Sequence, residues 1–258
     1  MAKQLDLANT ANRWLERSGG RGLLRLRIFC FPHAGSGTRI FRSWADELPL
    51  NFEVCAIRLP GRESRYSEPA FRQLEPMVES LVPALQPFLD IPFVMFGHSM
   101  GALLAYEVTR RLLTINAVEP VALFVSAHRA PQLPTRHRAL HDLPRDQLIA
   151  ELKALHDAPV EAFDDEDFID VVLPTLRGDL ELAETYKFVD GPMLSCPVIA
   201  MGGTFDASVV PEELDRWRAI TEGSFKLLLF EGDHFFVDNP STSFLPVLRR
   251  ELAMLKLD

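Results

Sequence analysis

The sequence predicts an α/β protein with a mostly parallel central sheet and helices on both faces of that sheet. Short apolar runs alternate with amphipathic stretches along most of the chain, as in folds built from strand–helix–strand units. These runs are mostly apolar, which is typical of parallel strands buried on both faces. The expected strands are 24–31, 52–57, 93–96, 122–126, 197–201 and 225–230.

The stretches between these strands have the spacing of amphipathic helices. The expected helices of the main body are 39–48, about 74–89, 100–113, 212–220 and 243–255. Residues 1–22 end in the breaker Gly19-Gly20-Arg21-Gly22 and are expected to form an N-terminal arm. Residues 23–258 are then expected to form a single domain.

The segment from about 130 to 189 interrupts the alternation, because it contains no strand-like run. Two amphipathic helices are expected instead, at 145–156 and 164–187. A helical insertion between two strands of a sheet is a candidate lid over an active site. The alternative is that these helices only add cover to the sheet.

Composition limits the classes of function. The 258 residues are 47% hydrophobic and 24% charged, as in an ordinary globular protein. A net charge of −9 disfavours nucleic acid as a partner, since phosphate binding needs a basic face. The N-terminus has no apolar signal region and no run reaches membrane-spanning length, so no membrane partner is expected. Three widely separated cysteines suggest reduced thiols and a cytoplasmic protein.

The strongest motif is Gly97-His98-Ser99-Met100-Gly101. It directly follows the expected strand 93–96 and opens the expected helix 100–113, which is the context of a nucleophile elbow. Such a turn is strained, and the two glycines allow the strand and the helix to approach closely. The motif therefore predicts the α/β-hydrolase fold with Ser99 as nucleophile.

A serine nucleophile needs a base and an orienting acid, which follow it along the chain in this fold. His234 lies in a loop after the last expected strand and is the predicted base. Asp206 follows the strand 197–201 and is the predicted acid. Asp190 and Asp233 compete for this role, but Asp190 precedes the strand and Asp233 would have to fold back onto the histidine.

The oxyanion hole needs two backbone N–H donors. Met100 would supply one from the N-terminus of the helix, and Ala34 is the candidate for the second, in the loop after the first strand. This loop has neither the G-x-G-x-x-G spacing of a dinucleotide site nor the pattern of a phosphate loop. We expect neither a cofactor nor a metal.

Several separated motifs give the chain a resemblance to the type II thioesterases, the free-standing editing enzymes of polyketide and nonribosomal peptide assembly lines. They are Phe31-Pro32-His33-Ala34-Gly35, Leu59-Pro60-Gly61-Arg62-Glu63, Gly97-His98-Ser99-Met100-Gly101, Arg129-Ala130-Pro131, Leu176-Arg177-x-Asp179 and Gly232-Asp233-His234-Phe235-Phe236. The resemblance implies a triad of Ser99, Asp206 and His234, with Met100 and Ala34 in the oxyanion hole. The stretch Leu155-His156-Asp157-Ala158-Pro159 departs from the family, whose members often have a small glycine-rich turn there.

The resemblance also implies a substrate and partners. The substrate would be an acyl thioester on the phosphopantetheine arm of an acyl or peptidyl carrier protein, with acyl-CoA as a surrogate. His33, Arg58, Arg62 and Arg65 are candidate contacts to the substrate or to the acidic carrier. For the arginines, the alternative is ordinary ion pairing within the protein or at its surface.

Two other classes of function remain open from the sequence. The chain could be a general acyl-CoA thioesterase, a carboxylesterase, a lipase or a peptidase of the same fold, since the triad does not exclude them. It could also be a binding module without activity, although a complete Ser, Asp and His set in the right order argues against that. The family motifs favour the thioesterase.

Overall fold

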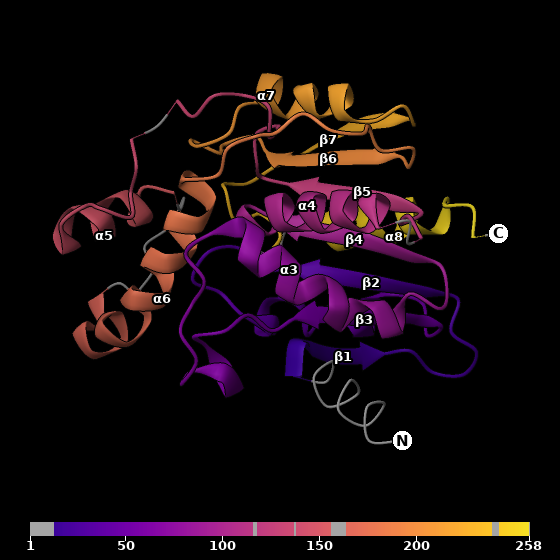
Figure 1. The fold of residues 1–258 in the computed structure, drawn as a ribbon, viewed down its shortest axis with the longest axis horizontal. Coiled ribbons are helices and arrows are strands. Elements are labelled where there is room, and N and C mark those ends of the chain that lie inside the picture. The colour runs from indigo at the N-terminus through magenta and orange to yellow at the C-terminus, as the bar shows by residue number, and fades with distance from the viewer. Residues whose placement is uncertain (1–12, 116–117, 137, 156–163, 239–242, 258) are drawn as a thin grey trace.

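The central feature of the fold is one seven-stranded sheet (Figure 1). The computed structural model describes residues 13–115, 118–136, 138–155, 164–238 and 243–257. The strand order is β1-β3-β2-β4-β5-β6-β7, and every pair is parallel except β1 with β3. The strands are β1 (Leu15–Gly19), β2 (Leu26–Phe31), β3 (Phe52–Ile57), β4 (Phe93–His98), β5 (Ala122–Ser126), β6 (Val198–Gly203) and β7 (Phe225–Phe230).

All six strands expected from the sequence are present, and the mostly parallel sheet is confirmed. The strands β2 to β6 are buried along their whole length, which explains why they are mostly apolar. The two charged residues in these strands, Arg27 and Glu53, form an ion pair with each other. Strand β7 is only partly buried, because it lies at the edge of the sheet.

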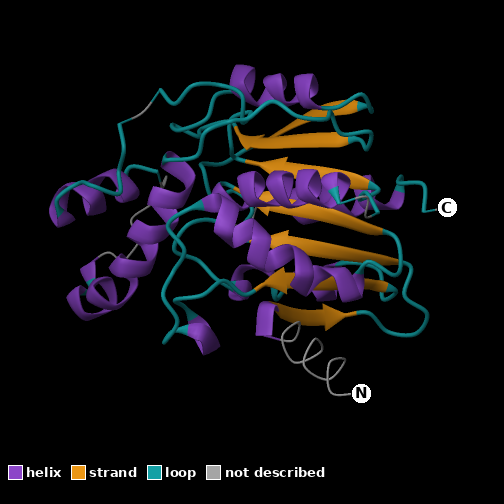
Figure 2. Ribbon diagram, viewed as in Figure 1, coloured by secondary structure: helices purple, strands orange, loops and turns teal. Residues whose placement is uncertain are grey.

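Helices cover both faces of the sheet (Figure 2). On one face, α3 (Leu74–Leu85) and α4 (Met100–Thr114) share a hydrophobic cluster with α7 (Pro211–Asp215). On the other face, α2 (Trp44–Glu47) and α8 (Phe244–Ala253) form a second cluster. Three expected helices are each divided into an α-helix and a 3₁₀ turn. The range 39–48 becomes the 3₁₀ turn Thr38–Phe41 and α2, about 74–89 becomes α3 and the 3₁₀ turn Gln86–Phe88, and 212–220 becomes α7 and the 3₁₀ turn Arg216–Ile220.

The structure corrects the expected N-terminal arm. Residues 1–12 lie outside the described part of the chain, but residues 15–19 form the edge strand β1, which pairs antiparallel with β3. Trp14 and Leu15 are buried in the core. The sheet therefore begins before Gly22. Only Leu15 is apolar among the residues of this strand, so its sequence has little strand character.

The helical segment lies at one end of the sheet strands (Figure 1). Its two α-helices are α5 (Arg145–Lys153) and α6 (Glu166–Glu184), and the described residues from 130 to 189 include no strand. Both helices lie beyond the ends of the parallel strands toward which the arrows point (Figure 2). These carboxyl ends are where ligands bind in open α/β sheets. No helix among the described residues is both long and apolar enough to span a bilayer.

Candidate functional site

Ser99 lies in the sharp turn between β4 and α4. Its φ of 53° lies in the left-handed region that non-glycine residues rarely adopt, so the backbone is strained there. A Cβ at Gly97 would lie 2.1 Å from the carbonyl oxygen of Gly101, and one at Gly101 would lie 2.1 Å from that of Phe31. Both glycines are therefore needed for this turn.

Ser99, His234 and Asp206 form one hydrogen-bonded chain. The Ser99 Oγ lies 2.9 Å from Nε2 of His234, and Nδ1 of His234 lies 2.8 Å from Oδ2 of Asp206. The imidazole and the carboxylate are both buried, with side chains 7% and 1% exposed. Gly203 permits this approach at the end of β6, since a Cβ there would lie 2.2 Å from the Asp233 carbonyl oxygen.

The Asp206 carboxylate is held in its ionised form. Burial alone would raise the pKa of Asp206, but hydrogen bonds from His234 and Ser208 outweigh it and lower the pKa below its ordinary value. Its Oδ1 accepts from the Ser208 hydroxyl at 2.7 Å and from the amides of Ser208 and Val209. An ionised carboxylate in this position favours a proton on Nδ1 of His234.

Neither competing aspartate occupies this position. The carboxylate of Asp233 accepts a hydrogen bond from the amide of Phe235 at 2.7 Å. Asp190 is exposed after α6, before the start of β6. Asp206 is the carboxylate that meets the imidazole of His234.

Sequence reasoning missed two other polar side chains in this site. The Ser208 Oγ lies 3.0 Å from Nδ1 of His234, so this hydroxyl contacts both His234 and Asp206. His98 packs against the His234 ring, with centroids 5.5 Å apart, and its Nδ1 lies 2.9 Å from the Ser126 Oγ. Burial and the nearby histidines hold the pKa of His98 well below its ordinary value, so His98 adds no positive charge beside His234.

The two expected oxyanion donors lie on adjoining segments. Met100 is the first residue of α4, so its N–H has no acceptor within the helix. The close approach of Gly101 to the backbone of Phe31 and Pro32 places the loop after β2 against this first turn. Ala34 lies in that loop, and among the described residues its N–H donates to no protein acceptor.

The sequence and the fold of this chain are similar to those of known proteins. A family model described as a thioesterase domain matches residues 26–249. This chain belongs to the thioesterase family. The gramicidin S biosynthesis protein GrsT of Aneurinibacillus migulanus is 35% identical over 251 residues, which are 97% of this chain and 98% of that protein.

Two solved structures are also similar. The RedJ thioesterase from the prodiginine pathway of Streptomyces coelicolor has a TM-score of 0.83 at 37% identity, covering 88% of this chain and 91% of that one. The type II thioesterase BorB from the borrelidin cluster has a TM-score of 0.82 at 31% identity, covering 94% and 97%. The predicted resemblance to type II thioesterases and the α/β-hydrolase fold are thus confirmed, and the chain is a hydrolase of thioesters.

The three arginines that are candidate carrier contacts of this thioesterase all form ion pairs within the protein, but they differ in burial. Arg62 is buried in an ion pair with Asp179, and Arg65 is buried in one with Glu68. The prediction that these two arginines meet an external phosphate or carrier is therefore wrong, because both guanidinium groups are used inside the protein. Arg58 is partly buried and pairs with Glu16 at 3.1 Å.

His33, the remaining candidate contact, lies beside the triad. Its ring packs edge-on against His98 and Phe235, with centroids 5.7 and 5.0 Å apart. Its Nδ1 lies 3.0 Å from the Ala34 carbonyl oxygen, and its Nε2 lies 3.5 Å from the Asp238 carboxylate. His33 therefore contacts the proposed oxyanion loop and remains a candidate substrate contact.

The sequence also predicts an apolar inner face for the helical segment, drawn from Leu148, Leu152, Phe168, Val172 and Leu176. The burial of these residues agrees with that prediction in part. Leu148, Leu152 and Leu176 form a buried cluster against which Ala34 packs. Val172 is half-buried. Phe168 is 45% exposed, so its prediction as an inner-face residue is wrong; it lies in the first turn of α6, where the helix has few buried side chains.

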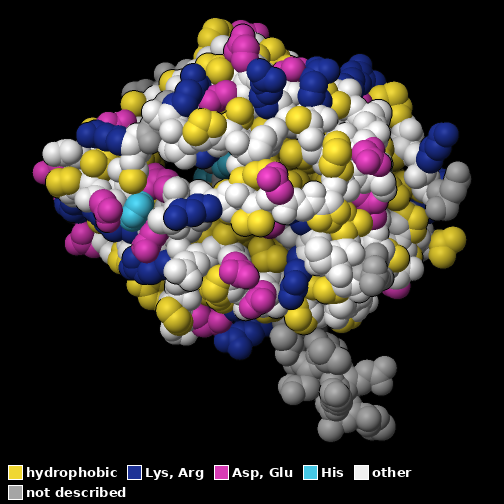
Figure 3. Space-filling model, turned by 45° about the horizontal axis from the view of Figure 1, so that its top comes forward, with side chains coloured by type: hydrophobic (Ala, Val, Ile, Leu, Met, Phe, Trp, Pro, Cys, Tyr) yellow, Lys and Arg dark blue, Asp and Glu magenta, His cyan; other side chains and the backbone are white. Residues whose placement is uncertain are grey.

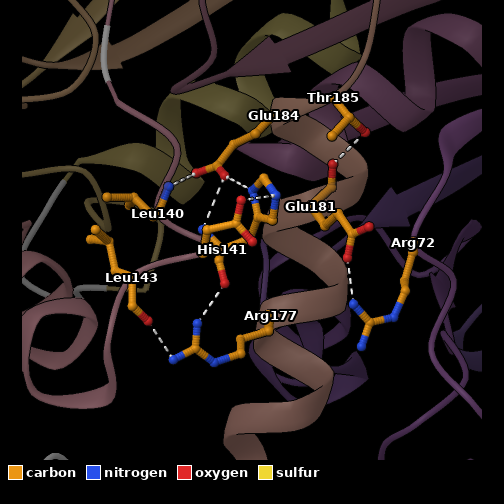
Figure 4. Close-up of polar contacts among 9 residues, drawn as sticks. Arg72, Leu140, His141, Leu143, Arg177, Glu181, Glu184 and Thr185 are labelled. Carbon is orange, nitrogen blue, oxygen red and sulfur yellow. Dashed lines mark hydrogen bonds and ion pairs between the residues drawn. The ribbon is translucent and has the colours of Figure 1, made fainter.

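Polar side chains of α6 also hold the segment that leads into α5 (Figure 4). Glu184 accepts hydrogen bonds from the amides of Leu140 and His141 and from the His141 ring. Arg177 donates to the carbonyl oxygens of His141 and Leu143.

Beside this helical segment the surface is hollowed, and a histidine side chain is visible inside the hollow (Figure 3). Among the described residues, no group of three or more His, Cys, Asp or Glu side chains could hold a metal ion.

Proposed function

We propose that this thioesterase hydrolyses acyl thioesters carried on the phosphopantetheine arm of carrier proteins, through an acyl-serine intermediate. The removal of stalled or aberrant acyl groups in polyketide or nonribosomal peptide assembly is its proposed role. The observation that carries the proposal is the hydrogen-bonded chain from Ser99 through His234 to Asp206 in a member of the thioesterase family. The relatives from gramicidin S and borrelidin biosynthesis support this setting.

The first half of the reaction transfers the acyl group to the enzyme. His234 Nε2 takes the proton of the Ser99 hydroxyl as Oγ forms a bond to the thioester carbonyl carbon. The negative charge that develops on the carbonyl oxygen is held by the N–H groups of Met100 and Ala34. The carbon–sulfur bond then breaks, and the departing sulfur takes the proton from His234. A thiol has a pKa near ~8.5, so it needs less help to leave than an amine.

The second half releases the acid. A water molecule gives a proton to His234 Nε2 while its oxygen attacks the acyl-serine carbonyl carbon. The same two N–H groups hold the second oxyanion, and the bond to Ser99 Oγ breaks as the serine regains its proton. Asp206 stays ionised throughout and stabilises the imidazolium of His234, because its pKa lies below its ordinary value.

The proposed partner is tested by presenting the same acyl group on coenzyme A and on a carrier protein. Coenzyme A and a carrier protein present the same phosphopantetheine arm, so we expect both thioesters to be hydrolysed. The carrier adds a docking surface, and its contacts are expected to raise kcat/KM above the value for acyl-CoA. With a net charge of −9 on this chain, docking to an acidic carrier should depend on apolar contacts and local cations such as Arg58.

The measurement is kcat/KM for the same acyl group on CoA and on several carriers, at low and high salt. Arginine contacts to an acidic carrier would make the carrier value fall with salt more steeply than the CoA value. A clear preference for acyl-CoA over every carrier would instead identify a general acyl-CoA thioesterase. Side-by-side rates on a nitrophenyl ester test the carboxylesterase alternative.

We propose further that α5 and the segment around it act as a lid. Helix α5 buries only Leu148 and Leu152, and a helix of nine residues is not stable without packing. Helix α6 is held more firmly, since its Asp179 is 1% exposed and paired with Arg62. Helix α5 should therefore open more readily than α6, which is the more stable of the two.

Hydrogen exchange tests this difference. We expect the amides of α5 to exchange faster than those of α6, and both to exchange faster than the amides of β4 and α4. The helix α4 is a suitable reference, because most of its residues are buried. Protection of α5 equal to that of the central strands would contradict a moving lid.

A further inference from the structure

A buried ion pair joins α6 to the loop that carries Ala34. Nη1 and Nη2 of Arg62 donate to the two carboxylate oxygens of Asp179, each at 2.7 Å. The same carboxylate accepts from the amide of Gly35 at 2.8 Å, and Arg62 Nη1 also donates to the Ser36 carbonyl oxygen at 2.7 Å. Both side chains are less than a tenth exposed.

This contact fixes one peptide unit on both sides. The peptide between Ala34 and Gly35 gives its N–H to Asp179, and its carbonyl oxygen lies 3.0 Å from Nδ1 of His33. Since a carbonyl oxygen only accepts, Nδ1 of His33 is the donor. The Ala34 N–H belongs to the preceding peptide unit, which shares the Ala34 Cα with this one. Holding the peptide plane 34–35 at both ends therefore limits how far the Ala34 N–H can move.

Apolar packing and a second carboxylate hold the same loop. Leu176 lies one helical turn before Asp179 on α6, and a Cβ at Gly35 would come within 2.9 Å of it. At the far end of the loop, the Glu63 carboxylate accepts from the amide of Thr38 at 2.9 Å. Charge-assisted bonds of this kind are stronger than neutral ones.

We propose that Asp179 is a positioning residue, which acts with Arg62 to hold the loop 33–37 so that the Ala34 N–H faces the oxyanion. This role rests on the proposed function, because it concerns the oxyanion of that reaction. The ion pair touches neither Ser99 nor His234. It therefore affects the stabilisation of the transition state and leaves the activation of the nucleophile unchanged.

The test is Asp179→Asn, with kinetics and two inhibitors measured on the folded protein. Loss of one oxyanion donor costs about 10²–10³ in kcat, so loosening its loop should lower kcat roughly 10–100-fold, with KM changed by less than about threefold. The inhibition constant of a trifluoromethyl ketone analogue, which forms an oxyanion on Ser99, should rise by a similar factor. That of a non-hydrolysable thioether analogue, which forms none, should not change.

Glu68→Gln is the matched control. Glu68 pairs with the buried Arg65 in the same stretch of chain, and its carboxylate contacts arginines rather than the loop 33–37. It should lower thermal stability but leave kcat within about twofold. Arg62→Lys is a second variant for the case in which Asp179→Asn does not fold, because it keeps the charge and loses the paired hydrogen bonds.

The outcomes separate the positioning role from the proposed function. Equal weakening of both inhibitors, or a kcat as high as that of Glu68→Gln, would overturn the positioning role. An unchanged dependence of kcat/KM on pH is expected, since the triad is not touched. A wild-type chain that hydrolyses no thioester would refute the proposed function itself, whatever the variants do.

Discussion

Replacing Ser99 by alanine is expected to lower kcat for thioester hydrolysis by roughly 10³-fold or more and to abolish formation of the acyl-enzyme. The hydroxyl lies 2.9 Å from Nε2 of His234, so its loss removes both the nucleophile and the proton that the base takes. The rate that remains would come from the oxyanion donors and from substrate binding alone. Single-turnover kinetics on acyl-CoA and labelling with a fluorophosphonate probe measure the two effects.

The fold should survive this substitution. Alanine removes one oxygen, and the backbone hydrogen bond from the Ser99 amide to the Ser126 carbonyl oxygen, at 2.7 Å, stays in place. Alanine must adopt the same φ of 53°, which costs it no less than it costs serine, so a gain in thermal stability is not expected from relief of strain. Near-normal turnover by the variant would refute the proposed mechanism.

The elements predicted best from the sequence are those in which a local pattern and its burial agree. The strands β2 to β6 are buried on both faces, so each appears as a mostly apolar run. The elbow is also a local feature, because the two glycines that it needs, Gly97 and Gly101, lie in one stretch of five residues. A Cβ at either of them would collide with backbone atoms. The expected order Ser99, Asp206 and His234 along the chain rests on the α/β-hydrolase fold that the elbow indicates.

The features that were missed depend on contacts between distant segments. Strand β1 is held by its pairing with β3 and by the burial of Trp14, and neither is visible in a short segment with several polar residues. Ser208 touches His234 across 26 positions in the sequence. Arg62 and Asp179 are 117 positions apart, so each appeared in the sequence as a separate charged residue. A charge beside a turn is equally compatible with a surface contact and a buried ion pair, and only the fold decides between them.

Asp206→Asn is expected to lower kcat by about 10⁴-fold with the fold intact. The carboxylate accepts from Nδ1 of His234 at 2.8 Å, which leaves Nε2 free to take the serine proton. An amide can present an N–H to Nδ1 instead, and that would favour the tautomer with the proton on Nε2. The matched control is Asp233→Asn, one residue from His234, whose carboxylate accepts from the Phe235 amide and whose loss should cost far less activity.

Stability against pH gives this prediction a second readout, independent of turnover. The pKa of Asp206 is lowered in the folded protein from an ordinary value of 3.8, so the ionised carboxylate stabilises the fold above that pH and the contribution is lost as pH falls. The free energy of unfolding of the wild type should therefore exceed that of Asp206→Asn by more at pH 7 than at pH 3. A crippled Asp233→Asn beside an active Asp206→Asn would show that Asp233 orients the base. A loss of activity in Asp206→Asn without this pH-dependent difference would mean that its carboxylate is not the buried, ionised partner of His234.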